Sequence, residues 1–156
     1  VIVSSHGGNT SAVDSVILKA RVELDMLAVG TAWLRFGFPD GLYSAHEKAF
    51  GIHGGAIETS LMLHYRPDLV VRDAIANFPS RMEPLQAELQ YLSAYGPHRF
   101  GWLSNDLNSE GVVGDARMAS AEKGAAHADH ILRGFAGLLG EIAAFDLDWL
   151  AQGEKR

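Results

Sequence analysis

The chain has 156 residues, 47% of them hydrophobic and 21% charged, which is ordinary for a soluble globular domain. Its formal net charge of -6 and its lack of any Lys or Arg run argue against a nucleic-acid partner. Because it contains no cysteine, disulfides and thiolate metal sites are excluded, and any metal ion must be bound by His, Asp, Glu or water.

No apolar stretch approaches the roughly 20 residues that a membrane-spanning helix requires, and no signal peptide is recognisable. We therefore expect a cytoplasmic protein without a membrane partner. The chain begins without Met on Val1-Ile2-Val3, a β-branched run typical of a buried strand. This opening predicts that further residues precede it in the complete protein.

The first elements predict an α/β unit. Residues 1–3 form a strand and residues 4–9 a glycine-containing turn. A helix follows, because apolar residues recur at intervals of three and four, with Asn9, Thr10 or Ser11 as its cap. These apolar residues are Val13, Val16, Ile17, Ala20 and Leu24. Residues 27–34 (LAVGTAWL) predict a second buried strand, although periodicity alone does not separate it from a helix.

The rest of the chain predicts loops around two helices. Residues 36–54 read mainly as a long loop, and residues 56–65 as a helix that ends before Pro67. Residues 77–97 look like an excursion over the surface, followed by a short strand within 98–103. The clearest helix spans 118–145, and because four glycines weaken it, we expect close packing on a sheet to support it.

The first candidate site is the segment 5–9 (SHGGN), placed between the first strand and the first helix. In α/β sheets, ligands gather at the carboxyl ends of strands. Gly7 and Gly8 allow a sharp turn and close approach to a ligand, and His6 could bind a metal ion. The alternative is that His6 only hydrogen-bonds a neighbouring loop.

The second candidate is the segment 51–60 (GIHGGAIETS), where a histidine again precedes a helix in a glycine-rich turn. His53 and Glu58 could serve as a metal ligand and a general acid/base. A Glu near a helix N-terminus is also favoured by the helix dipole without any function.

The third candidate is Asp115 in the segment 110–115 (EGVVGD), which fits a helix cap as well as a functional carboxylate. His127 and His130 have a spacing compatible with shared metal binding, but without a third partner we expect exposure or packing.

Together and in this order, residues 5–9, 51–60 and 110–115 resemble the creatininase family of amidohydrolases. Its members carry Gly-His-Gly-Gly-Asn after a strand, then His-Ala-Gly-Glu-x-Glu-Thr-Ser, then Gly-Val-x-Gly-Asp, or variants of these. The flank 119–124 (ASAEKG) also matches. The resemblance covers nearly the whole chain, and the ordered combination is specific.

The resemblance implies an α/β three-layer sandwich with a mostly parallel sheet flanked by helices. Residues 1–156 would be the C-terminal part of one such domain. It further implies a homo-oligomer, often hexameric, and two divalent metal ions (Zn, Mn or Fe). The implied reaction is hydrolysis of a non-peptide C–N bond in a cyclic amide or formamide.

The resemblance also implies roles for single residues. His6 would be a metal ligand, His53 the general acid/base that protonates the leaving nitrogen, and Glu58 a metal ligand or orienting group. The substrate would be bound by Gly7, Gly8, Asn9, Gly54, Gly55 and Asp115.

Several departures qualify this reading. The family's other ligands, a Glu-x-His pair and an Asp, belong to an N-terminal half that the chain does not contain. Creatinine-hydrolysing members have Tyr and a metal-binding Glu where this chain has Gly7 and Gly8, and a Trp-Asp pair where it has Ala49-Phe50. Ala56 replaces a frequent Glu. Creatinine is therefore not the expected substrate.

Two other readings compete with the hydrolase. The first is a catalytically inactive relative that acts as a ligand-binding or assembly module. The second is a phosphate- or nucleotide-binding α/β domain, which is disfavoured because neither turn matches a dinucleotide or P-loop pattern and no Lys follows the glycines.

Overall fold

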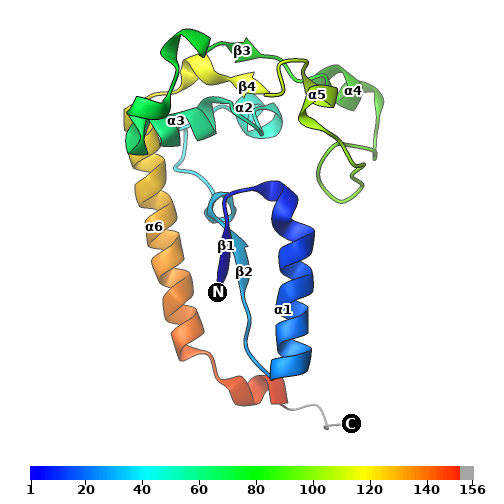
Figure 1. The fold of residues 1–156 in the computed structure, drawn as a ribbon, viewed down its shortest axis with the longest axis vertical. Helices are drawn as coiled ribbons and strands as arrows, with labels where there is room; N and C mark the ends of the chain where they lie inside the picture. The colour runs from blue at the N-terminus through cyan, green and yellow to red at the C-terminus, as the bar shows by residue number, and fades with distance from the viewer. Residues whose placement is uncertain (152–156) are drawn as a thin grey trace. The chain divides into compact units, whose positions relative to one another are not determined.

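The computed structural model describes residues 1–151 and contains helices of varied length and a few short strands (Figure 1). In chain order the elements are β1 (Ile2–Ser4), α1 (Thr10–Leu24), β2 (Gly30–Ala32), α2 (Ala45–Phe50), α3 (Ala56–Tyr65), β3 (Asn77–Phe78), α4 (Met82–Glu88), α5 (Ser104–Leu107), β4 (Gly114–Asp115) and α6 (Ala121–Ala144). None of the helices in this described part is both long and apolar enough to cross a membrane.

The chain divides into two compact units. Unit 1 comprises residues 1–38 and the segment from Asp129 onward, and unit 2 comprises Pro39–Ala128. The helix α6 contributes its first two turns to unit 2 and the remainder to unit 1.

Unit 1 is built on a parallel strand pair. Ile2 of β1 lies opposite Gly30 of β2, and Ser4 lies opposite Ala32. Parallel strands need a crossover connection, which α1 supplies. The helix packs closely on β2 because position 30 is a glycine, where a Cβ atom would lie closer than 3.0 Å to Val13. Figure 1 shows the pair between α1 and the later turns of α6, the helix–sheet–helix order of an α/β protein.

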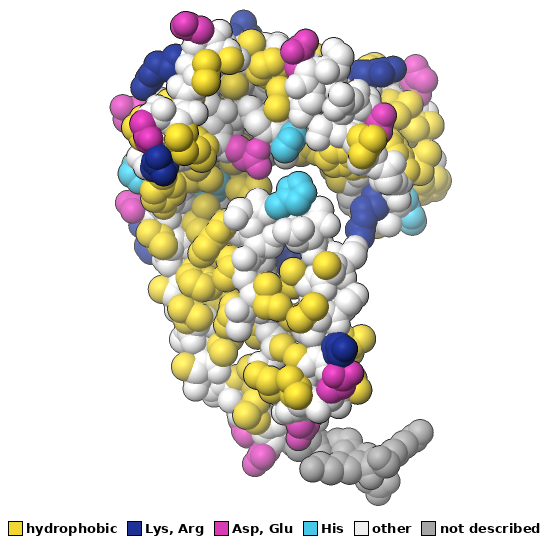
Figure 2. Space-filling model, viewed as in Figure 1, with side chains coloured by type: hydrophobic (Ala, Val, Ile, Leu, Met, Phe, Trp, Pro, Cys, Tyr) yellow, Lys and Arg dark blue, Asp and Glu magenta, His cyan; other side chains and the backbone are white. Residues whose placement is uncertain are grey.

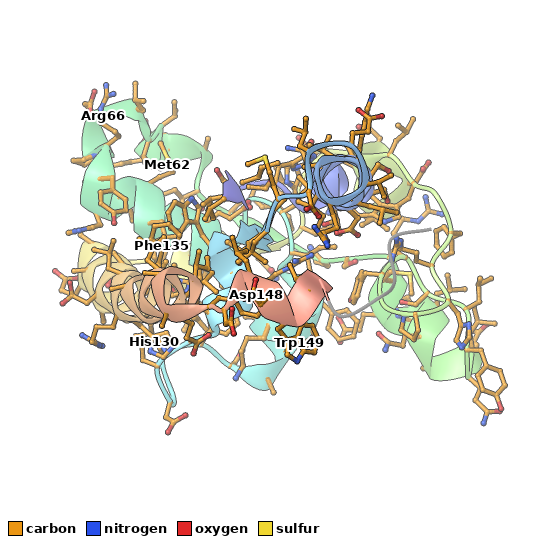
Figure 3. The ribbon with its side chains drawn as sticks, turned by 90° about the horizontal axis from the view of Figure 1, so that it is seen from below. Met62, Arg66, His130, Phe135, Asp148 and Trp149 are labelled. Atoms are coloured by element: carbon orange, nitrogen blue, oxygen red, sulfur yellow. The ribbon has the colours of Figure 1, made fainter. Side chains whose placement is uncertain are left out.

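The later part of α6 packs on the segment that follows β2. Phe135 meets Trp33 edge to face, with ring centroids 5.2 Å apart, and His130 Nε2 lies 2.9 Å from the Phe36 carbonyl oxygen. Both α6 residues are labelled in Figure 3. Gly134 lies so close to the Phe36 ring that a Cβ atom there would clash. The predicted close packing of this helix is therefore present, but in unit 1 it involves the 3-10 turn Trp33–Phe36.

Unit 1 also leaves apolar side chains at its surface. The described part of the sheet has only the two strands β1 and β2, and no residue of α1 is fully buried. Figure 2 shows apolar side chains along α1. Within residues 1–24, the large apolar side chains that are more than a third exposed are Val1, Ile2, Val16, Leu18, Val22 and Leu24.

Unit 2 has a buried polar cluster where α3 meets the start of α6. Ser60 is fully buried, and its hydroxyl donates to the Ala56 carbonyl (2.5 Å) and accepts from Ser120 N (3.2 Å). His127, also fully buried, packs its ring against Tyr43. Gly124 permits this crossing because a Cβ atom there would collide with the Ser60 backbone.

Unit 2 also has a core of buried apolar residues, which includes Val113, the residue before β4. It consists of Met82, Ala94, Leu107 and Val113, with Phe50, Ile52, Tyr95, Phe100 and Trp102 packed around them. Trp102 Nε1 donates to the Ala94 carbonyl at 2.6 Å, so the ring is both packed and hydrogen-bonded.

The α/β class is confirmed, and so are the first strand, the first helix, the helix at 56–65 and the long final helix. The second strand is shorter than predicted, because residues 33–36 turn into a 3-10 helix. The prediction for 98–103 was wrong: this segment makes one isolated bridge, between Arg99 and Ser93.

Two segments predicted as irregular contain helices. The helix α2 lies inside 36–54, and α4 lies inside 77–97 together with β3. Both helices are short, and the apolar periodicity over six or seven residues is too brief to distinguish a helix from a loop.

Candidate functional site

The His6 turn is held by local hydrogen bonds. The Ser4 hydroxyl donates to the His6 carbonyl (2.9 Å) and accepts from His6 N (3.1 Å), and Asn9 Nδ2 donates to the same hydroxyl (3.3 Å). Asn9 is the residue before α1, but its side chain makes no capping hydrogen bond to the helix. Residues 5–9 are all exposed. The Ser4 hydroxyl therefore takes part in all three of these hydrogen bonds, and the residues of the turn itself are exposed to solvent.

The imidazole of His6 lies over Gly8. A Cβ atom at position 8 would be 2.7 Å from His6 Nε2, whereas one at Gly7 would meet nothing within 4 Å. His6 and Asn9 line an open hollow with residues of β1 and with Ala12, Val13 and Val16 of α1. Any side chain at position 8 would therefore share the space of the His6 ring.

The His53 turn is hydrogen-bonded to Val113 and leads directly into α3. Val113 N donates to the His53 carbonyl at 2.7 Å in an antiparallel bridge. Gly54 has φ = 73°, a conformation that favours glycine, and a side chain there would strike Val112. The turn then enters α3 at Ala56, with Gly55 and Ala56 buried.

His53 and Glu58 face one another at the start of α3. His53 Nδ1 lies 3.9 Å from Glu58 Oε2, and the two side chains are 39% and 38% exposed. The same carboxylate oxygen accepts a hydrogen bond from Gly54 N at 2.6 Å. The backbone therefore fixes Glu58 beside the imidazole, and the pair remains accessible for proton transfer.

Asp115 acts as a cap in this structure. Its carboxylate accepts from Arg117 N (3.2 Å) and from Arg117 Nε (2.8 Å), at the start of the 3-10 turn Ala116–Met118. Hydrogen bonding to the Arg117 guanidinium lowers the pKa of the Asp115 carboxyl below its usual range. The alternative that the sequence left open, a cap, is thus realised, and a substrate-binding role stays a prediction.

Glu47 is a site residue that the sequence reasoning missed. It lies in α2, is 6% exposed, and hydrogen-bonds the backbone of both α3 and β4. The signal was present, because residues 44–47 (SAHE) follow the Ser-x-x-Glu pattern of a helix start. The Ser44 hydroxyl does accept from Glu47 N at 3.0 Å, as that pattern predicts.

The described residues do not complete a metal site. No group of three or more His, Cys, Asp or Glu side chains gathers anywhere in residues 1–151. His6 with Gly7, Gly8 and Asn9 belongs to unit 1, whereas His53, Gly54, Gly55, Glu58 and Asp115 belong to unit 2. Within unit 2 the structure brings His53 and Glu58 together, and Glu47 joins their turn to Asp115.

The creatininase family model, described as creatinine amidohydrolase, matches residues 1–139 of the chain. The chain belongs to the creatininase family. None of the curated proteins is similar enough to the chain to count as a match.

Solved structures of the family share the fold. A Bacteroides fragilis protein assigned as a creatinine amidohydrolase is 27% identical, with a TM-score of 0.67 over 94% of this chain and 54% of its own. A creatininase with one Trp-to-Phe substitution is 23% identical (TM-score 0.65; 89% of this chain, 54% of its own), and a manganese creatininase is 21% identical (TM-score 0.57; the same coverage). The chain thus spans about half the length of these structures.

Proposed function

We propose that the protein containing this chain is a metal-dependent amidohydrolase that cleaves a non-peptide C–N bond in a small cyclic amide or formamide. The observation that carries this proposal is the His53–Glu58 pair, held at the start of α3 by Gly54 N and Val113 N. Membership of the creatininase family and the likeness to a manganese creatininase support it.

In this proposal His53 is the general acid/base. Its Nδ1 edge faces Glu58, so the other ring nitrogen, Nε2, would deliver a proton to the leaving nitrogen. Glu58 would keep the ring in this orientation and would stabilise the imidazolium that forms during proton transfer. Its own placement comes from the 2.6 Å hydrogen bond with Gly54 N.

The metal ions would be bound only in part by this chain. His6 would be one ligand, and Glu58 could be a second ligand instead of orienting His53. Two divalent ions of Zn, Mn or Fe per complete site are proposed from the family resemblance, with further ligands from outside this chain. A bound ion of this kind supplies an activated water molecule and polarises the substrate carbonyl.

The substrate is proposed to differ from creatinine. Phe50 is packed against the core of unit 2, and the Ala49 carbonyl accepts a hydrogen bond from the Tyr95 hydroxyl. Where creatinine-hydrolysing members have Trp-Asp, this chain therefore has a small Ala49 without an aromatic ring and a core-packed Phe50 without a carboxylate. Gly7, Gly8, Asn9, Gly54, Gly55 and Asp115 are proposed to border the substrate. A cytoplasmic homo-oligomer, such as a hexamer, is proposed from the resemblance.

The test is metal content and hydrolysis in the complete protein, compared with His6→Ala, His53→Ala and the control His98→Ala, which changes an exposed histidine. We expect about two metal ions per wild-type chain. His6→Ala should lose metal, whereas His53→Ala should keep metal and lose about 100- to 10,000-fold in kcat on cyclic amides and formamides. A protein that binds no metal contradicts the proposal.

A second candidate, a catalytically inactive ligand-binding or assembly module, is favoured by two positions of the sequence. According to the family resemblance, Gly8 and Ala56 stand where relatives have carboxylates. A complete protein that folds and assembles but neither loads metal nor hydrolyses any amide would favour this candidate.

A further inference from the structure

Glu47 is a buried carboxylate to which the proposed mechanism gives no role. Its Oε1 accepts a hydrogen bond from Ala56 N (2.5 Å), and its Oε2 accepts one from Asp115 N (3.0 Å). Both oxygens act as acceptors, as they do in an ionised carboxylate. One side chain therefore links α2 to the first residue of α3 and to β4.

The two segments that Glu47 joins are the ones that carry the His53 turn. The bridge from Val113 N to the His53 carbonyl pairs them, and beyond it Gly55 and Gly114 still lie in close approach while α3 begins at Ala56. Ala56 N belongs to the first turn of α3, where backbone N–H groups have no partner inside the helix. The carboxylate binds Ala56 N and Asp115 N at the point where backbone pairing stops.

Three glycines leave the space that the carboxylate occupies. Gly51, Gly55 and Gly114 are all buried, and a Cβ atom at any of them would lie closer than 3.0 Å to Glu47 Oε1. At Gly51 the nearest atoms all belong to the Glu47 carboxylate. Glycines at three places in the chain therefore leave room for this one carboxylate.

We propose that Glu47 is a positioning residue that holds the His53–Glu58 pair in its reactive orientation. The inference rests on the proposed function, because it assigns His53 the same role. Burying a carboxylate is unfavourable unless hydrogen bonds compensate, and charge-assisted bonds to backbone N–H groups are short and well oriented. Without Glu47, the hydrogen bond from Val113 N to the His53 carbonyl would remain, but the link from Ala56 N to Asp115 N through one carboxylate would be lost.

The experiment compares the complete protein with Glu47→Gln and Glu47→Ala, and with Glu83→Gln as a control on an exposed carboxylate of the same unit. Amide exchange of Ala56 and Asp115 reports the two hydrogen bonds. NMR signals of the His53 ring, assigned by their loss in His53→Ala, report its orientation. Steady-state kinetics on whichever cyclic amide or formamide the wild-type protein hydrolyses separate kcat from KM.

We expect faster exchange at both amides and shifted His53 ring signals in the Glu47 variants. The kcat should fall by about 10- to 100-fold while KM stays within about twofold, because misplacement of a catalytic group by about 1 Å has such an effect. Glu83→Gln should change none of these quantities. Unchanged ring signals and kcat, with faster amide exchange, would reduce Glu47 to a structural role and overturn the proposal.

Gly51→Ala tests the same contact when Glu47→Ala does not fold. It displaces the carboxylate while retaining the charge, so it should shift the His53 signals in the same way. Where Glu47→Ala does fold, adding Gly51→Ala to it should cost much less stability than Gly51→Ala costs alone, because the clashing carboxylate is gone. If the protein hydrolyses no amide, the proposed function fails, yet the exchange and ring signals still decide the positioning of His53.

Discussion

The two histidine turns have nearly the same sequence, His-Gly-Gly, but very different support. The His6 turn is exposed along residues 5–9 and is held by the Ser4 hydroxyl. The His53 turn is bridged to Val113, tied through Glu47 to β4, and enters its helix through two buried residues. A glycine-rich motif thus allows a turn to form, while residues elsewhere in the chain determine how firmly it is held.

Replacing the second glycine after each histidine by Ala should give the largest difference in stability between the two turns. In Gly55→Ala, the new Cβ atom would meet Glu47 Oε1, the Gly51 carbonyl at 3.0 Å and the Gly114 Cα at 3.1 Å. Two of these are backbone atoms that cannot rotate away, so we expect a loss of about 3 kcal/mol in unfolding free energy.

The matched variant is Gly8→Ala, whose Cβ atom meets only the movable ring of His6. It should cost less than about 0.5 kcal/mol, as exposed substitutions usually do. Urea unfolding of the complete protein measures both. Equal losses at the two positions would show that the turns are supported alike.

Glu58→Gln tests whether the negative charge beside His53 contributes to catalysis. The amide can still accept from Gly54 N, so α3 keeps its first turn, but the negative charge beside His53 is lost. We expect kcat to fall about 10- to 100-fold with little change in thermal stability, within the range of general acid–base effects. Glu83→Gln is again the control. A kcat within twofold of wild type would mean that Glu58 only stabilises the start of α3.

The sequence predicted the candidate histidines and the main helices, because these depend on local pattern. Residues 56–65 show the apolar spacing of a helix, with Pro67 as the stop, and the structure has the helix there. Glu47 was missed because its role depends on contacts with Ala56 and Asp115, which are 9 and 68 residues away in the chain. Local pattern predicts which residues can react but does not show which buried residue orients them.

The smallest expected effects concern Asp115, whose backbone and side chain have separate roles. Its N–H binds Glu47, while its carboxylate binds Arg117. Asp115→Asn keeps the backbone bond, so the His53 turn should remain intact and kcat should stay within about twofold of wild type. A large rise in KM would instead reveal the substrate-binding role predicted from the sequence.

Arg117→Gln removes the guanidinium beside the Asp115 carboxylate but keeps the backbone N–H of residue 117 that this carboxylate caps. Because Arg117 lowers the pKa of the Asp115 carboxyl, its loss should raise that pKa toward the ordinary value of about 3.9. The lowered pKa stabilises the fold above the unfolded-state value, and this contribution disappears as pH falls through the folded-state value. An NMR titration of the Asp115 carboxyl between about pH 2 and 6 measures the change. A pKa that does not move would mean that the backbone N–H of Arg117, retained in Arg117→Gln, is the partner that matters.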